Sequence, residues 1–314
     1  MTPLAKMARD YLRLRRSLGF KLRSYDRYLA RFVAFMRQQG ASRITTELAV
    51  RWAVLPPTRS AAEQARRLRV VRGFSQYCTG LDPRTEIPPK GLLPGRDRRV
   101  QPYIYTDEEV EQLMLAAKQL PSTVTSAPGL RAATYETLIG LLVATGLRIS
   151  EALRLDRADI DWTNGVLTIR ETKFCKSRLV PIHSTTTRAL QRYAQRRDKI
   201  YRTPITAGFF VRENGDRLGY DGVRATFVRL SRETGLRGPH DSRGPRMHDC
   251  RHRFAVRTLI RWYREGSDVE QLLPVLSTYL GHEKVSDTYW YLTAVPELLQ
   301  LAMARMECAS RRAP

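Results

Sequence analysis

Cysteine is scarce in this 314-residue chain, and its four residues lie far apart. They form no C-x-x-C pair, so the sequence predicts neither a disulfide framework nor a cysteine-type zinc site. Long apolar runs are also missing. None approaches the roughly 18 residues of a membrane helix, and arginines interrupt the first apolar stretch, where a signal peptide needs continuity. We therefore expect a cytoplasmic protein without a membrane partner.

Several common catalytic signatures are missing as well. The sequence contains no G-x-x-x-x-G-K-[ST] phosphate loop, no G-x-G-x-x-G turn, no H-E-x-x-H pair and no G-x-S-x-G elbow. Acidic residues are dispersed except at Glu108 and Glu109, whose place in a predicted first helical turn suits the helix dipole better than a pair of metal ions. We therefore expect neither a nucleotide cofactor nor a metal.

Negative charge is in short supply: 31 acidic residues face 54 lysines and arginines, which gives a formal net charge of +23. The first 100 residues carry +15 of this surplus. Most of the basic residues are arginines, whose planar guanidinium groups suit bidentate contacts with phosphate. Such a charge attracts polyanions, so nucleic acid is the first partner to expect.

Helical periodicity and proline content divide the chain into two domains. Apolar residues recur at helical spacing over residues 4–18, 25–36, 47–54 and 60–77, which predicts a small basic helical unit. Prolines and arginines then dominate residues 80–102, and this composition opposes both helix and central strand. We assign residues 1–95 to a helical domain, 96–103 to a basic proline-rich linker and 104–314 to a second domain.

Helices dominate the predicted second domain as well. Thr106 and Glu109 form a capping box before a helix over 107–119, and a helix over 131–145 ends at Gly146. Strand patterns occur near 166–170 and 177–182, with one further short strand possible at 208–212. The expected fold class is mainly α with a small antiparallel β-sheet in the C-terminal domain, an α+β arrangement.

Five separated segments of the second domain carry residues suited to phosphate chemistry. They are residues 144–153 around Arg148, Lys173 between two strand-like runs, residues 248–252 with Arg251, the Leu280-Gly281-His282 triplet, and Tyr291 nine residues later. In this order and spacing they resemble the tyrosine recombinases, the phage integrase family of DNA strand-exchange enzymes. Residues 103–301 are similar to that family's catalytic domain, and the first 95 or so to its helical core-binding domain.

The resemblance implies a mechanism centred on two arginines and a tyrosine. Arg148 and Arg251 would clamp the non-bridging oxygens of the scissile phosphate, where fixed cations stabilise the additional charge of the transition state. Tyr291 would attack phosphorus, leaving a 3′-phosphotyrosine and a free 5′ hydroxyl. Tyr289 is the competing nucleophile, and the spacing from His282 favours Tyr291.

The same resemblance implies how protons are handled. His248 would assist proton transfer at the nucleophile, and it shares a predicted helix face with Arg251. Lys173 would be the general acid for the leaving 5′ oxygen; the family usually has a glycine after this lysine, and here Phe174 follows, so Lys176 remains a competitor. His282 would hydrogen-bond the phosphate.

Two further residues would support the implied catalytic residues without contacting the phosphate. Glu151, one turn after Arg148, would orient a cationic neighbour, although an exposed helix charge is the alternative. His252 adjoins the motif and could equally be a structural residue. We also leave open whether the Gly- and Pro-rich stretch 235–245, with its arginines, is a plain loop or a DNA-contacting insertion.

The resulting hypothesis is a site-specific DNA recombinase whose two domains wrap double-stranded DNA as a clamp. By resemblance, four identical protomers would assemble on two paired DNA sites, possibly with other recombinases or accessory proteins. Two alternatives stay open: a non-catalytic or degenerate DNA-binding protein of the same fold, and a DNA-relaxing enzyme similar to type IB topoisomerases.

Overall fold

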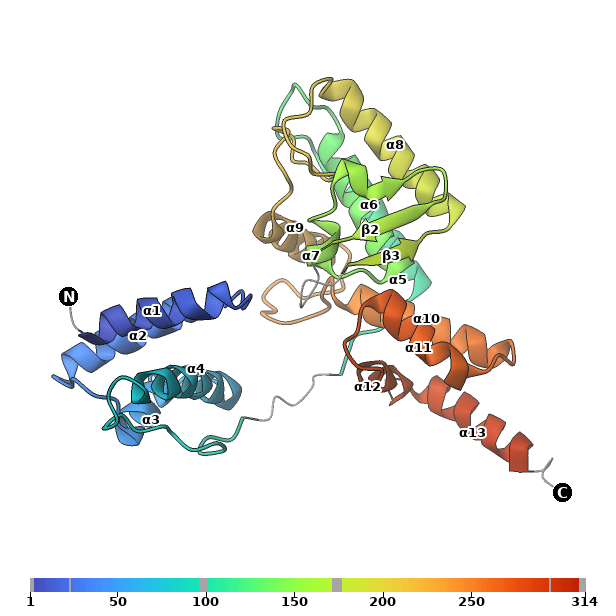
Figure 1. Cartoon of the computed structure of the whole chain (residues 1–314). Helices are drawn as coiled ribbons and strands as arrows, with labels where there is room; N and C mark the ends of the chain where they lie inside the picture. The colour runs from blue at the N-terminus through green and yellow to red at the C-terminus, as the bar shows by residue number, and fades with distance from the viewer. Residues whose placement is uncertain (1–2, 23, 96–100, 171–176, 294, 311–314) are drawn as a thin grey trace. The chain divides into compact units, whose positions relative to one another are not determined.

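Four amphipathic helices build the first of the two units into which the chain divides, Met1–Val100 and Gln101–Pro314 (Figure 1). The computed structural model describes residues 3–22, 24–95, 101–170, 177–293 and 295–310. The helices of the first unit are α1 (Pro3–Ser17), α2 (Tyr25–Gln38), α3 (Thr46–Val54) and α4 (Ala61–Thr79). The hydroxyls of Thr45 and Ser60 accept hydrogen bonds from amides in the first turns of α3 and α4, which explains where these helices begin.

One arginine of α4 belongs to the core of this unit. Arg67 is only 5% exposed, and its guanidinium carbon lies 4.0 Å from the centre of the Trp52 ring. It donates to the carbonyl of Trp52 at 2.7 Å and to that of Leu55. Its neighbours Arg66 and Arg69 are exposed. Arg67 therefore holds the end of α3 and the connection that follows it against α4, whereas Arg66 and Arg69 contribute to the basic surface.

The proline-rich stretch after α4 packs onto the first unit as far as residue 95. It contains no helix or strand between residues 80 and 95. The Glu86 amide donates to the Ile44 carbonyl at 2.9 Å, and the Glu86 carboxylate accepts from the Thr46 amide at 2.8 Å. Residues 96–100 of the predicted linker lie outside the described residues.

Helix α6 lies at the centre of the second unit and packs against α5, α8 and α10. The capping box starts α5 as predicted, because the side chains of Thr106 and Glu109 each accept from the other's backbone amide. The elements of this unit, in chain order, are α5 (Asp107–Lys118), α6 (Leu130–Thr145), α7 (Ile149–Ala152), η1 (Arg157–Asp159), β1 (Ile160–Asp161), β2 (Val166–Ile169), β3 (Arg178–Pro181), α8 (Ser184–Ile200), α9 (Tyr220–Glu233), α10 (Asp249–Arg264), α11 (Val269–Leu280), α12 (Ser286–Tyr289), η3 (Trp290–Thr293) and α13 (Pro296–Ser310).

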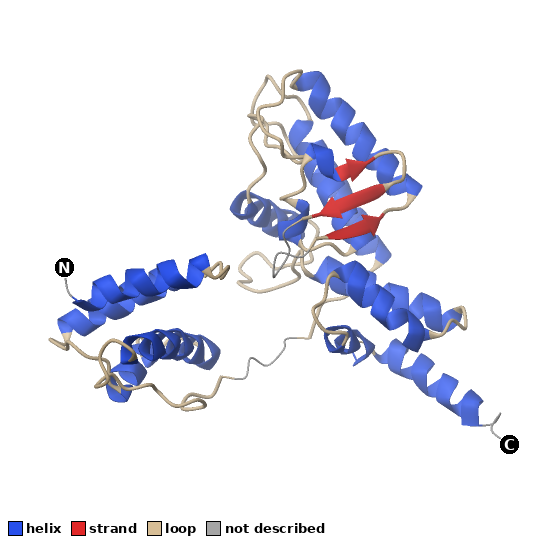
Figure 2. Cartoon of the chain, viewed as in Figure 1, coloured by secondary structure: helices blue, strands red, loops and turns tan. Residues whose placement is uncertain are grey.

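A three-stranded antiparallel sheet in the order β1-β2-β3 lies among these helices (Figure 2). Leu167 of β2 pairs with Val180 of β3, and both side chains are fully buried. The predicted fold class, mainly helical with a small antiparallel sheet, is confirmed. The further strand considered at 208–212 is wrong, because only isolated bridges occur there in the described structure. Phe209 and Phe210 are apolar because they fill the core, and burial gives the same sequence pattern as a strand.

A separate apolar cluster joins α10, α11, η3 and α13. Leu259, Leu273 and Leu298 are buried in it, and so is Tyr291 of η3. Among the described helices, none combines the length and apolarity needed to cross a membrane.

Candidate active site

The C-terminal end of α6 places the first arginine of the site. Gly146 ends α6 with a left-handed φ of 61°, and a Cβ atom there would lie 2.7 Å from the Phe254 ring of α10. Only glycine combines this backbone with such a close approach. The carbonyl of Gly146 accepts a hydrogen bond from Arg251 Nη1 at 2.9 Å, and Arg148 follows as the residue before α7. One helix end therefore brings Arg148 near Arg251.

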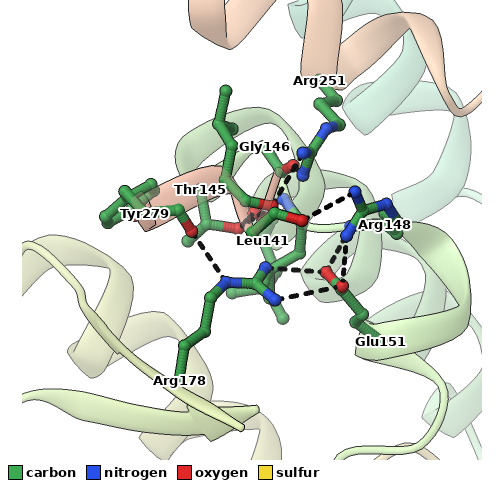
Figure 3. Close-up of polar contacts among 11 residues, drawn as sticks. Leu141, Thr145, Gly146, Arg148, Glu151, Arg178, Arg251 and Tyr279 are labelled. Atoms are coloured by element: carbon green, nitrogen blue, oxygen red, sulfur yellow. Dashed lines mark hydrogen bonds and ion pairs between the residues drawn. The ribbon is translucent and has the colours of Figure 1, made fainter. Parts of the chain in front are cut away.

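Three arginines meet at the C-terminal end of α11. Arg178 Nε donates to the carbonyl of Tyr279 at 2.8 Å, Arg251 Nη2 to that of Leu280 at 2.7 Å, and Arg148 Nη2 to that of Gly281 at 3.0 Å. The last carbonyls of a helix lack partners within the helix and form the negative end of its dipole. These three consecutive carbonyls therefore hold three guanidinium groups in fixed directions (Figure 3).

The buried carboxylate of Glu151 joins two of these arginines. It accepts from the backbone amide of Arg148 at 3.0 Å and from Arg148 Nη1 at 2.8 Å, and from Arg178 at 3.1 and 2.9 Å (Figure 3). Its side chain is 1% exposed. Burial alone would raise the pKa of this carboxyl, but the hydrogen bonds and charge of Arg178, followed by those of Arg148, lower it to about 2. Glu151 is therefore ionised at neutral pH and paired with both arginines, and it is not an exposed helix charge.

Arg251 is a buried cation. The residue is 1% exposed, and burial, followed by the neighbouring charge of Arg148, lowers its pKa to about 10. A side-chain hydrogen bond with Tyr291 opposes this shift. Arg251 remains protonated at neutral pH, although burial and the charge of Arg148 both disfavour its charged form.

Two histidines, His252 and His282, lie against the Tyr291 ring, and a third, His248, lies against His252. The ring centres of His248 and His252 are 5.0 Å apart, that of His252 is 5.4 Å from the Tyr291 ring, and the His282 ring stacks on Tyr291 at 5.9 Å. His282 Nδ1 lies 2.8 Å from Thr288 Oγ1. His248 is the residue immediately before α10, at its N-cap, so it precedes the helix that carries Arg251.

The pKa values of His248 and His282 are both lowered. His248 is an exposed residue, yet desolvation of its ring, together with the charges of His252 and Arg251, lowers its pKa to about 4. Desolvation, followed by the charges of Arg251 and Arg148, lowers the pKa of His282 to about 4 as well. Both imidazoles are therefore neutral at pH 7 and able to accept a proton.

The two candidate tyrosines differ sharply in position. Tyr291 is 3% exposed and lies against His252 and His282, whereas Tyr289 is 52% exposed. Tyr291 belongs to the short 3₁₀ segment η3. The structure thus brings Tyr291, and not Tyr289, to the arginines and histidines.

The predicted general acid lies outside the described residues, as does its competitor: Lys173 and Lys176 both fall within 171–176. The choice between them stays a prediction. Residues 235–245 form a loop without helix or strand, in which Arg237 donates to the Pro245 carbonyl at 3.0 Å. No group of three His, Cys, Asp or Glu side chains suited to a metal ion occurs among the described residues.

Arg178 is the site residue that the sequence reasoning missed. It fell within the strand predicted near 177–182. Alternation along β3 places it on the same face as Val180, which is fully buried, so this charged residue faces inward and requires a partner. A charged residue in the inward register of a strand was the signal that could have identified it.

Comparison with known proteins identifies the family of the chain. Residues 104–297 match the model of the Phage integrase family. The chain is 47% identical over 308 residues to integrase/recombinase y4rB of Sinorhizobium fredii, covering 98% of both chains. It is 30% identical over 226 residues to tyrosine recombinase XerC of Chlamydia caviae, covering 72% of this chain and 65% of that one.

Solved structures share the fold at low sequence identity. The Tn1549 transposon integrase in complex with transposon right end DNA matches with a TM-score of 0.67 and 18% identity, covering 99% of this chain and 100% of that one. The XerH site-specific recombinase bound to its difH substrate matches at 0.65 and 19%, covering 91% and 79%. By family model, relatives and fold together, the chain belongs to the phage integrase family of tyrosine recombinases and is a site-specific recombinase.

Proposed function

We propose that this recombinase cleaves and rejoins double-stranded DNA at a defined site through a 3′-phosphotyrosine on Tyr291, without a metal or nucleotide cofactor. The convergence of Arg148, Arg251 and Tyr291 carries the proposal. These residues are spread over more than 140 positions, yet two guanidinium groups and a buried tyrosine share one site with two neutral histidines. The arginines supply the positive charge that phosphoryl transfer requires.

In this mechanism the Tyr291 oxygen forms a bond to phosphorus as the bond from phosphorus to the 5′ oxygen breaks. The phenol proton passes to neutral His248, with His252 packed between the two rings. The leaving 5′ oxygen takes a proton from Lys173, with Lys176 as the alternative donor. Arg148, Arg251 and His282 hold the non-bridging oxygens. The covalent bond conserves the phosphodiester energy, so rejoining needs no nucleotide.

The two units would have different functions, DNA binding and catalysis. We assign DNA binding of the core type to residues 1–95, a linker to 96–103 and catalysis to 104–314, with both domains closing on the duplex as a clamp. The exposed Arg66 and Arg69 of α4 support phosphate contacts by the first domain. Such a protein would act in the cytoplasm.

We further propose that four copies assemble on two DNA sites, alone or with other recombinases or accessory proteins. The C-terminal helix α13 exposes Leu299 by 47% and Met303 by 61%. Apolar side chains exposed on a terminal helix suit a contact between protomers. Light scattering of the purified protein with its captured site would give the mass of a tetramer on two duplexes, and a mass of one protein per duplex would contradict this assembly.

The test is metal-free covalent capture. Purified protein is mixed with fragmented host DNA in EDTA and stopped with detergent, and the ends of the DNA in covalent adducts are then sequenced. Wild-type protein should give adducts at one recurrent sequence, and Tyr291→Phe should give none while it keeps its DNA affinity. Tyr289→Phe is the matched control and should capture DNA as the wild type does.

Each other outcome points elsewhere. Adducts spread over all sequences would favour an enzyme similar to the type IB topoisomerases. Tight, salt-dependent binding without adducts would favour a non-catalytic DNA-binding protein. Capture by Tyr291→Phe but not by Tyr289→Phe would move the nucleophile to Tyr289.

A further inference from the structure

Arg178 makes its side-chain hydrogen bonds to residues outside the sheet. It is the first residue of β3 and its side chain is 10% exposed. Two of its nitrogens bind the Glu151 carboxylate side by side, and the third donates to the Tyr279 carbonyl at the end of α11. All three nitrogens of the guanidinium group are therefore used, by two partners that belong to different elements.

One of these partners, Glu151, also binds Arg148, and the other lies two residues before the carbonyl that Arg148 uses. Arg148 has two side-chain anchors, the Glu151 carboxylate and the Gly281 carbonyl. Arg178 holds the first anchor directly. It also packs against the second, because a Cβ atom on Gly281 would lie 2.7 Å from Arg178 Nη1. The guanidinium of Arg178 thus contacts both residues that anchor the Arg148 guanidinium, and Figure 3 shows the shared carboxylate of Glu151 between the two arginines.

We propose that Arg178 is a positioning residue for strand cleavage: by holding Glu151 and the end of α11 together, it fixes Arg148 in the direction required to meet the scissile phosphate. The proposal rests on the proposed function of Arg148. A lysine at position 178 keeps the charge but cannot make two parallel bonds to the carboxylate while also reaching the Tyr279 carbonyl, since its donors share one nitrogen. Arg178→Lys therefore removes the geometry and retains the charge.

A second buried arginine of the same unit provides a matched control. Arg197 is 3% exposed at its side chain, binds the Asp198 carboxylate through two nitrogens and donates to the Phe209 carbonyl at 2.7 Å. Its chemistry matches that of Arg178, but its partners are not the anchors of Arg148. Arg197→Lys therefore reports the general cost of replacing such an arginine.

The experiment measures single-turnover cleavage at saturating protein on a duplex oligonucleotide that carries the captured site. A second duplex carries one methylphosphonate at the scissile position, which removes the negative charge that Arg148 would balance. We expect Arg178→Lys to cleave the phosphodiester about 10- to 100-fold more slowly than the wild type, with unchanged DNA affinity. On the methylphosphonate the defect should shrink several-fold, because the substrate no longer depends on a well-directed Arg148. Arg197→Lys should match the wild type on both duplexes.

Several results would overturn the proposal. A defect of equal size on both duplexes would show a general disturbance of the site, and a defect shared by Arg197→Lys would show a loss of folding. Wild-type rates for Arg178→Lys would show that Arg148 needs no such support. If Arg178→Lys does not fold, Glu151→Asp shortens the same link from the other side and should show the same recovery on the methylphosphonate. Absence of adducts with wild-type protein would instead refute the proposed function.

Discussion

Replacement of Glu151 by glutamine tests the electrostatic centre of the site independently of any DNA. The substitution keeps the size of the side chain but removes a buried negative charge that accepts from the side chains of Arg148 and Arg178. It also replaces one carboxylate oxygen by an amide NH2 group, which cannot accept a hydrogen bond from either arginine. Breaking one side of a buried ion pair leaves an uncompensated charge, which is among the more costly single changes in a protein.

The magnitude follows from the pKa of this carboxyl. A free glutamate ionises near 4.5, whereas Glu151 in the folded chain ionises at about 2. This difference corresponds to roughly 3 kcal/mol of stability at neutral pH. Because the folded-state pKa is the lower one, the contribution is fully present above pH 4.5 and is lost as the pH falls toward 2. Glu151→Gln should therefore lower the free energy of unfolding by about 3 kcal/mol at pH 7, and by progressively less below about pH 4.5.

Urea unfolding followed by tryptophan fluorescence, repeated from pH 7 down to about pH 3.5, measures this difference. Glu111→Gln is the control, since Glu111 is exposed on α5, and it should stay within about 0.5 kcal/mol of the wild type at every pH. A gap below about 1 kcal/mol at pH 7 would refute the reasoning. So would a gap that stays constant as the pH falls, because the loss would then come from packing and not from charge.

Three further outcomes are expected. Gly281→Ala should lose more stability and more cleavage activity than Gly266→Ala. The two glycines have a similar left-handed φ, +70° and +72°, so alanine causes a backbone strain of about 1–2 kcal/mol at both positions, but only at Gly281 does the new Cβ meet Arg178. Equal losses in urea unfolding would contradict this contact. The cleavage rate should fall as the pH drops through about 4, where His248 becomes protonated, and a midpoint near that of an ordinary histidine, about 6.5, would contradict the lowered pKa. Arg67→Met should destabilise the first unit by roughly 3 kcal/mol, because two backbone carbonyls lose their donors; a loss below about 1 kcal/mol in urea unfolding would show that Arg67 is dispensable.

Much of the fold follows from local patterns. Helical periodicity and the Thr106–Glu109 capping box predicted helices that the structure contains, with ends displaced by a residue or two. The antiparallel pairing of β2 with β3 agrees with the two strand patterns predicted near 166–170 and 177–182. The two-residue strand β1 escaped prediction because so short a pairing leaves no periodicity. Phe209 and Phe210 misled because a buried loop and a strand share the same apolar signature.

The site was less accessible to sequence reasoning than its side chains suggest. The five motifs named most of the residues that the structure gathers, but nothing in them indicated how the arginines are held. Arg148, Arg178 and Arg251 are anchored by backbone carbonyls at the end of α11. Every residue has a carbonyl, so such a partner leaves no trace in the amino-acid sequence. Only the structure reveals that three consecutive carbonyls are used.

These anchors also explain how the site can favour a transition state over its own resting state. Among the described residues, Arg148 and Arg178 share the carboxylate of Glu151, and both of them and Arg251 contact carbonyls at the partly negative end of α11. Positive charge is therefore in surplus, and the lowered pKa values of Arg251, His248 and His282 all arise partly from it. Under the proposed function, a phosphodiester would bring one negative charge into this field, and its transition state would place more charge on the same oxygens. Because the donors are already fixed by carbonyls, they would not need to reorganise when that charge develops, so the surplus would stabilise the transition state more than the bound substrate.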